Sequence, residues 1–195
     1  MARPREFDPD QVLDSAMHLF WEQGFDGTSI GDLEARMGIN RFSIYNTFGD
    51  KQGLFLAAMD RYRDRVVSDL ARELEHGDDG LGALRRFFQR VASAVASPDS
   101  RIGCFMVNCA VERSLDDPDA AERVRAHFDR IERAFHRCLK LARDSGQIGA
   151  DARLRDRARK LAVTFQGVLV GVKMAQDPAS LRGALRQLQR EIDTW

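Results

Sequence analysis

The sequence has few cysteines, no net charge and no long apolar run, and each absence excludes a class of protein. Three cysteines among 195 residues are too few for a disulfide-stapled secreted fold and are typical of a reducing compartment. The longest largely apolar run, Leu161 to Ala175, is shorter than the roughly 20 residues that span a bilayer and contains Lys173. The first residues lack the apolar segment of a signal peptide. We therefore expect a cytoplasmic protein that does not act on membranes.

The charges balance overall, with 30 basic and 30 acidic side chains, so no global positive field indicates a nucleic acid partner. Residues 1–48 carry a net negative charge, because they contain four arginines and eight aspartates and glutamates. Any contact with DNA in this region must depend on where individual side chains lie. The hydrophobic fraction of 44% is sufficient for a buried core.

Apolar residues recur throughout with the helical period, and no convincing alternating run predicts a strand. Asp-Pro pairs precede three of the periodic segments, where aspartate caps the free amides and proline fits the first turn. The sequence predicts an all-α fold with an N-terminal three-helix module in residues 1–50 and a larger helical body in residues 51–195. The expected helices are 9–23, 29–36, 40–46, 50–75, 81–96, 102–115, 118–145, 151–175 and 178–193.

Two short helices that meet at Gly38 suit a helix-turn-helix, in which glycine allows a sharp turn. Ile44 and Phe48 fall on the inner face of the second helix. The outer face mixes arginine, aromatic, hydroxyl and amide side chains, which are the groups that contact base edges and phosphates in a major groove. These outer residues are Arg41, Phe42, Ser43, Tyr45, Asn46 and Thr47.

The same region resembles the DNA-binding part of the TetR/AcrR transcriptional regulators. The similarity lies in an F-x-x-x-G-F-x-x-T-S segment from Phe20 to Ser29, a Gly-Ile turn at Gly38, and an S-I-Y-x-x-F-x-x-K-x-x-L run from Ser43 to Leu54. The resemblance implies a dimer that binds a double-stranded operator and responds to a small-molecule effector. It also implies phosphate contacts by Thr28, Tyr45 and Lys51, and we expect Arg3 and Arg5 to lie near the neighbouring groove.

In the body, the string from Arg101 to Glu112 combines a thiol, an amide and a carboxylate with apolar neighbours, as a ligand pocket does. It is similar to a G-C-x-x-x-N-x-A-x-E segment in a branch of the family that includes electrophile- and quinone-responsive repressors. The predicted effector-binding residues are Cys104, Phe105, Asn108, Glu112, Phe128, Phe135, Phe165 and Gln166.

Three roles for Cys104 are open from the sequence: a packed core residue, part of the pocket, or a reactive sensor. Reactivity would need a lowered thiol pKa, which a helix N-terminus and the nearby Arg101 favour. Cys109 and Cys138 are expected to be packing residues.

The last two helices carry apolar stripes that we interpret as the dimer surface, where two helices from each chain would form a four-helix bundle. The alternative is that both stripes are buried within one chain. The predicted dimer residues are Phe165, Leu169, Val172, Leu181, Leu185 and Leu188.

The sequence contains no hydrolase elbow, phosphate loop, dinucleotide fingerprint or spaced His/Cys metal motif. We therefore expect no enzymatic activity, no cofactor and no metal. The predicted function is a dimeric one-component transcriptional regulator, a repressor released from a palindromic operator by an effector. Two alternatives are a repressor that senses oxidants or electrophiles through Cys104, and a helical interaction protein without DNA binding.

Overall fold

The computed structural model describes residues 8–97, 102–150, 153–174 and 177–195, and across these ranges the chain is helical, with no strand. One long rod is continuous, because α4 passes through a π-helical segment, η1, into α5. This rod corresponds to the single helix predicted over 50–75, so the described ranges confirm the all-α fold with about nine helices. The elements are α1 (Pro9–Gln23), α2 (Ile30–Met37), α3 (Arg41–Phe48), α4 (Lys51–Tyr62), η1 (Arg63–Val67), α5 (Ser68–His76), α6 (Gly80–Val95), α7 (Phe105–Glu112), α8 (Pro118–Asp144), α9 (Leu154–Lys173) and α10 (Pro178–Asp193).

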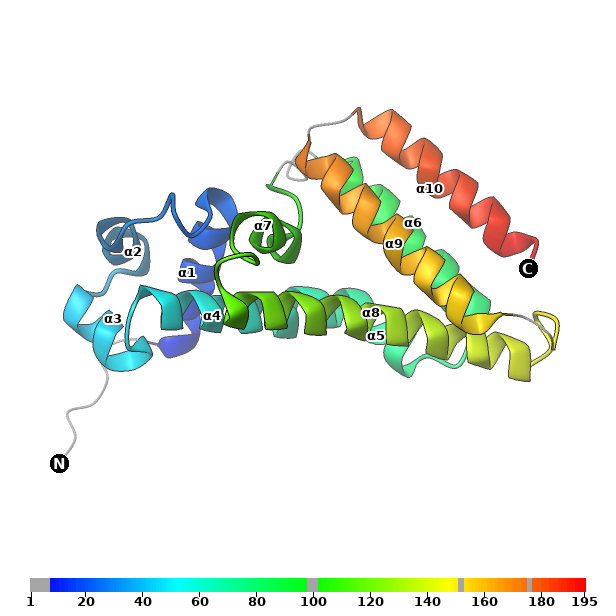
Figure 1. Ribbon diagram of the computed structural model, residues 1–195, viewed down its shortest axis with the longest axis horizontal. Coiled ribbons are helices and arrows are strands. Elements are labelled where there is room, and N and C mark those ends of the chain that lie inside the picture. Colours follow the sequence, from blue (N-terminus) through cyan, green and yellow to red (C-terminus); the bar gives the residue numbers. More distant parts are fainter. Residues whose placement is uncertain (1–7, 98–101, 151–152, 175–176) are drawn as a thin grey trace.

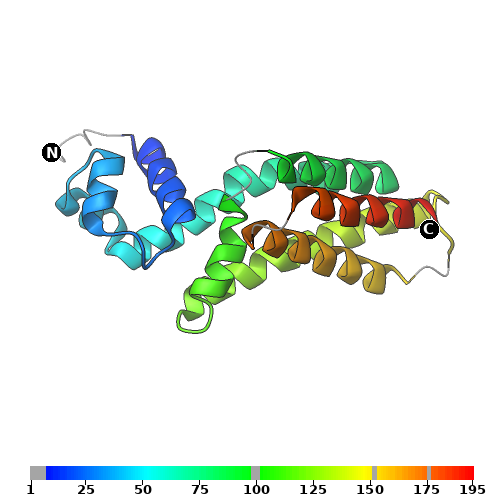
Figure 2. The same cartoon turned by 90° about the horizontal axis from the view of Figure 1, so that it is seen from above.

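The helices form two groups at opposite ends of an elongated molecule (Figure 1). The first group contains α1, α2, α3 and the start of α4, and the second contains α6, α9, α10 and the end of α8. The rod of α4, η1 and α5 runs beside α8 from one group toward the other, and α7 lies between the groups (Figure 2). A displacement at the body end of the rod can therefore reach the N-terminal group directly.

The N-terminal group has its own core, in which α1 packs against α2 and α4. Phe20, Leu33, Ile44 and Phe55 are fully buried there. The rings of Phe20 and Phe55 meet edge to face with their centroids 5.2 Å apart. Each buried side chain of this size stabilises the fold by roughly 1.5–3 kcal/mol, so these contacts fix the three short helices on α4.

The core of the body is built around four phenylalanines from α6, α8 and α9. The Phe87 ring lies 5.2 Å from the rings of both Phe135 and Phe165, and the Phe88 ring lies 5.6 Å from that of Phe135. These rings hold α6, α8 and α9 together around the wall of a cavity described below.

The helix predicted over 102–115 is shorter than expected, since α7 spans only Phe105–Glu112. Gly103 has a positive φ of 67°, which is not a right-handed helical conformation. α7 therefore begins only after Gly103, and Cys104 is its N-cap. Of the predicted face, only Asn108 and Glu112 therefore lie within the helix.

Gly80, the first residue of α6, allows a close approach between α6 and α8. A Cβ atom at this position would lie 2.5 Å from the backbone nitrogen of Ala142 and 2.5 Å from the carbonyl oxygen of Cys138. Gly80→Ala is therefore expected to lower the free energy of unfolding by about 1–3 kcal/mol, as overpacking of a core does. Chemical denaturation measures the change. Gly31→Ala in exposed α2 is the control, because its Cβ meets nothing closer than 3.6 Å, and an equal loss in both variants would contradict the packing argument.

Candidate DNA-binding surface and effector pocket

The turn between α2 and α3 follows the predicted helix-turn-helix. Ser29 and Asp32 form a reciprocal capping box at the start of α2, and these hydrogen bonds lower the pKa of Asp32. Gly38 ends α2 in the left-handed region, with φ 68°. The Asn40 side chain then accepts a hydrogen bond of 2.9 Å from the backbone nitrogen of Ser43 and so caps α3.

α3 presents a mixed polar and aromatic face away from the protein. Phe42 is 71% exposed and Tyr45 is 43% exposed, whereas Ile44 between them is fully buried. Arg41 and Asn46 are also exposed, and Ser43 and Thr47 are half-buried. Aromatic rings that remain exposed to water leave apolar surface uncovered. A partner molecule can cover these rings and form hydrogen bonds with the neighbouring arginine and amide groups. In Figure 1 this helix lies at the extreme end of the molecule, where a duplex would meet no other helix first.

Arg41 is held at the start of α3 by Glu34 of α2. One Glu34 oxygen accepts a hydrogen bond of 2.6 Å from the Arg41 backbone nitrogen, and the other lies 3.6 Å from the Arg41 guanidinium. The Arg41 side chain is still 68% exposed. The pairing therefore orients the guanidinium without removing it from the surface.

Lys51, the first residue of α4, has its ammonium nitrogen 4.2 Å from the centre of the Phe25 ring. Asp50 caps the same helix by accepting from the Gly53 backbone nitrogen at 2.7 Å. A cation on an aromatic face keeps its charge, and the ring restrains where that charge lies. Lys51 is thus a fixed positive charge that lies at the helix terminus following α3.

The predicted phosphate contact by Thr28 does not fit the structure. Thr28 is 1% exposed, and its hydroxyl donates a hydrogen bond of 2.6 Å to the carbonyl oxygen of Gly24. This hydrogen bond fixes the connection between α1 and α2. The residue that caps α2 is the neighbouring Ser29. Arg3 and Arg5 lie outside the described residues.

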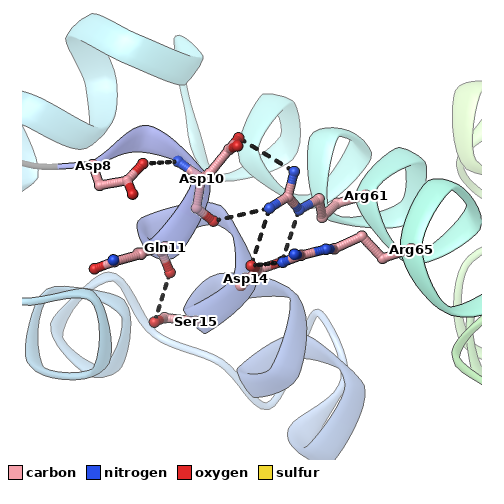
Figure 3. Close-up of polar contacts among 7 residues, drawn as sticks. All are labelled: Asp8, Asp10, Gln11, Asp14, Ser15, Arg61 and Arg65. Atoms are coloured by element: carbon pink, nitrogen blue, oxygen red, sulfur yellow. Dashed lines mark hydrogen bonds and ion pairs between the residues drawn. The ribbon is translucent and has the colours of Figure 1, made fainter.

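Two acidic residues of α1, Asp10 and Asp14, are paired with arginines of the long rod. Asp14 accepts a hydrogen bond of 2.7 Å from the Arg61 guanidinium and also pairs with Arg65, while Asp10 lies 3.2 Å from Arg61 (Figure 3). The hydrogen bond from Arg61 lowers the pKa of Asp14. Part of the negative charge counted in residues 1–48 is therefore offset by Arg61 at the end of α4 and Arg65 in η1.

A cavity of about 310 Å³ lies in the body, beside the junction of α4 and η1. Its wall is mainly aliphatic and aromatic, as in small-molecule sites. Of the predicted effector residues it contains Cys104 and Phe165. The other lining residues are Tyr62, Val66, Val67, Leu70, Arg90, Val91, Ala94, Val95, Gly103, His127, Ile131, Leu169 and Val172. A larger hollow of about 660 Å³ between α8 and α9 is lined mostly by charged side chains and lacks such a wall.

The polar residues predicted for the pocket serve other contacts. The Asn108 amide donates a hydrogen bond of 2.9 Å to the carbonyl oxygen of Ile102. Glu112 accepts one of 2.9 Å from the backbone nitrogen of Asp26, so it ties α7 to the end of α1. Neither side chain is among the residues that line the cavity.

Four further residues predicted for the pocket do not line it either. Phe105 packs edge to face on Phe55, and Phe135 is fully buried against Phe87. Phe128 and Gln166 are half-buried outside the cavity. Helical periodicity placed these side chains on inward faces but did not distinguish solid core from cavity wall.

The surroundings of Cys104 oppose the sensor interpretation. The thiol is buried, the Tyr62 hydroxyl donates to its sulfur at 3.5 Å, and burial raises the pKa of Cys104. A reactive thiol needs the opposite shift. Burial also raises the pKa of Cys109, and it raises that of Cys138 to about 11. Arg101, expected beside Cys104, lies outside the described residues.

The predicted dimer residues pack within their own chain, four of them buried and two, Leu169 and Val172, half-buried. On α10, Leu181, Leu185 and Leu188 pack toward α6 and α9 and are at most 7% exposed. Phe165, Leu169 and Val172 of α9 line the cavity. For Phe165 and the three leucines of α10 this burial agrees with the alternative of packing within one chain.

The opposite face of α9 carries a separate apolar stripe, here called the α9 stripe, of Val163, Gly167, Val170 and Met174. Val163 is 60% exposed, Val170 is 40% exposed and Met174 is 67% exposed. A Cβ at Gly167 would meet nothing within 4 Å. A row of exposed apolar residues is a candidate surface for contact with another molecule.

The described residues contain no group of three or more His, Cys, Asp or Glu side chains that could hold a metal ion. Within the same ranges, no helix has both the length and the apolar character that crossing a membrane requires.

Two family profiles match this chain. "Bacterial regulatory proteins, tetR family" matches residues 12–58, and "Tetracyclin repressor-like, C-terminal domain" matches residues 80–188. The chain belongs to the TetR family. The first match covers the helix-turn-helix and the start of the rod, and the second covers the body from α6 into α10.

Individual relatives agree with this assignment. The TetR-family chain is 34% identical over 171 residues to the uncharacterized HTH-type transcriptional regulator YezE of Bacillus subtilis (strain 168), across 85% of this chain and 88% of YezE. It is 31% identical over 194 residues to the HTH-type transcriptional repressor ComR of Escherichia coli (strain K12), across 99% of this chain and 91% of ComR.

A solved structure shows the same fold. The TetR family transcriptional regulator CifR, as a cysteine mutant complexed with 26-bp double-strand operator DNA, superposes with a TM-score of 0.85. The two chains are 24% identical, and the alignment covers 96% of this chain and 98% of CifR. At this identity the likeness concerns the arrangement of helices.

Sequence reasoning missed two polar residues in the cavity of this TetR-family protein, Tyr62 and His127. His127 is 2% exposed, and it lies on the same stripe of α8 as Val124 and Ile131. That spacing was the available signal, because a histidine on an apolar stripe is a buried polar group. Tyr62 lies at helical spacing with the apolar residues Leu54 and Ala58. The sequence therefore predicts that its ring is buried, but it does not predict which group its hydroxyl contacts.

Proposed function

We propose that this TetR-family chain is a dimeric one-component repressor that holds a palindromic operator through two copies of α3 and releases it when a small molecule fills the body cavity. The observation that carries this proposal is the outward face of α3, with Phe42 and Tyr45 exposed beside Arg41 and Asn46. DNA contact would come from residues 1–50 and the fixed charge of Lys51, and residues 51–195 would bind the effector and the second subunit.

Two of the comparisons support this proposal. ComR, which matches nearly the full length of the chain, is a transcriptional repressor. CifR, with the same arrangement of helices, has been solved on operator DNA. The proposed role is binding and release without catalysis, in the cytoplasm where the chromosome is accessible.

Selection of binding sites from a pool of random duplexes tests the proposal. We expect enrichment of inverted repeats, because two recognition helices related by a two-fold axis read half-sites about 34–36 Å apart. Enrichment of no sequence, together with salt-independent weak binding, would contradict the proposed function.

We propose that the second subunit covers the α9 stripe, together with two small residues of α10, the half-buried Gly183 and the exposed Ala184. Gly167 leaves room for a partner helix to approach closely, and the apolar side chains on either side would be removed from water. This corrected surface retains the predicted four-helix dimer but uses the faces that the chain leaves open.

The cavity is linked to the DNA-binding helices by Trp21 of α1. The Trp21 indole nitrogen donates a hydrogen bond of 3.0 Å to the carbonyl oxygen of Gly103, and its ring lies 4.9 Å from that of Tyr62. Gly103 and Tyr62 both line the cavity. An effector that moves this wall would therefore move α1 and, through the N-terminal core, α3. The effector releases DNA to the extent that it binds the released state more tightly.

Trp21→Phe is expected to retain operator binding and weaken the response to the effector, because phenylalanine keeps ring packing but cannot donate to Gly103. Coupling between two sites is typically about 5- to 150-fold in affinity, and we expect most of it to disappear. The measurement is the ratio of operator Kd values with and without an effector identified by thermal-shift screening. Trp195→Phe, which alters the other tryptophan at the far end of α10, is the control. Equal ratios for the wild type and Trp21→Phe would contradict this route.

A further inference from the structure

The chemistry of the cavity wall specifies what kind of molecule it takes, provided that the proposed effector role holds. Aliphatic and aromatic side chains form most of the wall, and no acidic residue or lysine is among the described residues that line it. Arg90 is exposed and already donates a hydrogen bond of 3.1 Å to the carbonyl oxygen of Asp69. Arg90 is the one charged side chain among the described lining residues, and because it is solvent-exposed the buried part of the wall carries none.

His127 is a buried polar residue in this mainly apolar wall. It is 2% exposed, and neither ring nitrogen has a hydrogen-bond partner among the described protein atoms. The ring of Phe128 lies edge to face against it, with centroids 4.8 Å apart, and offers no polar group. Buried polar groups without partners are rare because each one costs folding free energy. The unused hydrogen-bonding capacity of His127 therefore indicates a ligand.

The charge state of His127 narrows the ligand further. Burial, with help from the nearby positive charges of Arg130 and Arg63, lowers the pKa of His127 to about 4. A neutral imidazole has one N–H donor and one nitrogen acceptor. Its donor and acceptor both match an uncharged oxygen group, and without a positive charge the ring forms no ion pair with a carboxylate or phosphate.

Tyr62 supplies a second polar group on the same wall. Its hydroxyl hydrogen is directed at the Cys104 sulfur, 3.5 Å away, so the oxygen keeps lone pairs to accept from a ligand. A hydroxyl group on a ligand can donate and accept, and a carbonyl group can accept from the imidazole N–H.

We propose that the effector is an uncharged, mainly apolar small molecule with one hydroxyl or carbonyl group, which forms a hydrogen bond with His127. The aliphatic wall would bind the apolar part, and His127 would select the oxygen group. Binding would press on Tyr62 and Gly103, the residues that contact Trp21.

Calorimetric titration with three matched probes, heptan-1-ol, heptan-2-one and heptanoate, tests this inference on the full-length protein. We expect the alcohol or the ketone to bind more tightly than the carboxylate by at least 10-fold. His127→Leu, of similar volume, should weaken the neutral probes about 10-fold, and His127→Gln, which keeps a donor and an acceptor, should restore most of their affinity. Ethylbenzene, which has no polar group, should bind the wild type and His127→Leu alike.

Three outcomes would overturn the inference: preferential binding of heptanoate, equal affinity of all probes for the wild type and both variants, or no binding of any probe to the wild type. Should His127→Leu fail to fold, the wild-type ranking of the probes and the affinity of His127→Gln still decide the result. Operator binding without any probe is measured separately, so failure of the effector chemistry is distinguishable from failure of the proposed function.

Discussion

Tyr45→Ala is expected to weaken operator binding by about 100-fold or more. A hydrogen bond to a charged acceptor such as phosphate contributes roughly 1.5–3 kcal/mol, and a dimer would lose it twice. Lys51→Ala should weaken binding to all duplexes and lower the salt slope by about 0.9 for each phosphate that is no longer neutralised. The two variants therefore differ in what is measured: operator affinity for Tyr45→Ala, and affinity for all duplexes together with the salt slope for Lys51→Ala. Both variants remove interactions with the same DNA.

Gel-shift titration on the selected operator measures both effects. Tyr45 is 43% exposed and Ile44 carries the core packing of α3, so the melting temperature of Tyr45→Ala should equal that of the wild type. Val111→Ala, at an exposed position of α7, is the control with unchanged operator affinity. Unaltered affinity in a correctly folded Tyr45→Ala protein would show that the outward face of α3 does not contact DNA.

Val170→Glu is expected to convert the dimer into a monomer. A carboxylate in the centre of the α9 stripe would be removed from water at the interface, opposite or near its copy from the second subunit, and an unpaired buried charge costs several kcal/mol. The monomer would hold a single half-site without the gain of simultaneous binding at two, which reaches about 10²- to 10⁴-fold. The same variant should therefore bind the operator poorly with α3 intact.

Light scattering after size exclusion measures the mass. Gln89→Glu introduces the same charge at an exposed position of α6 and should remain dimeric. A dimer of unchanged stability in Val170→Glu would place the second subunit on a different surface.

The helix-turn-helix could be predicted from sequence because its determinants are local. The outward face of α3 is defined by three local features. These are the capping residues, the left-handed conformation of Gly38 and the helical spacing of the buried-face residues Ile44 and Phe48. The phosphate contact of Thr28 was expected only from the family resemblance. Its burial depends on how α1 and α2 pack, which the local sequence does not show.

The cavity and the dimer surface could not be predicted in the same way, because they depend on which partner each apolar stripe finds. The stripe of Leu181, Leu185 and Leu188 has the same spacing whether its partner is α6 of its own chain or a second subunit. The exposed Val163 and Val170 did not form a stripe strong enough to compete with it. The wall of the cavity combines side chains from distant segments, and periodicity within one helix cannot show where such segments leave space.

The acidic balance of the N-terminal residues also has a tertiary explanation. Arg61 and Arg65, which pair with Asp14, belong to the rod and lie beyond residues 1–48. A count of charges in residues 1–48 therefore omits the two arginines that pair with Asp14.

Photocrosslinking from the recognition helix is the most direct measurement of the central claim. With p-benzoylphenylalanine in place of Phe42, irradiation of the complex with the selected operator should crosslink to bases in both half-sites, about one helical turn apart. The same group in place of Gln89 on α6 should give no crosslink. Complexes that form with normal affinity but crosslink no better from position 42 than from position 89 would contradict the claim that α3 lies in the DNA groove.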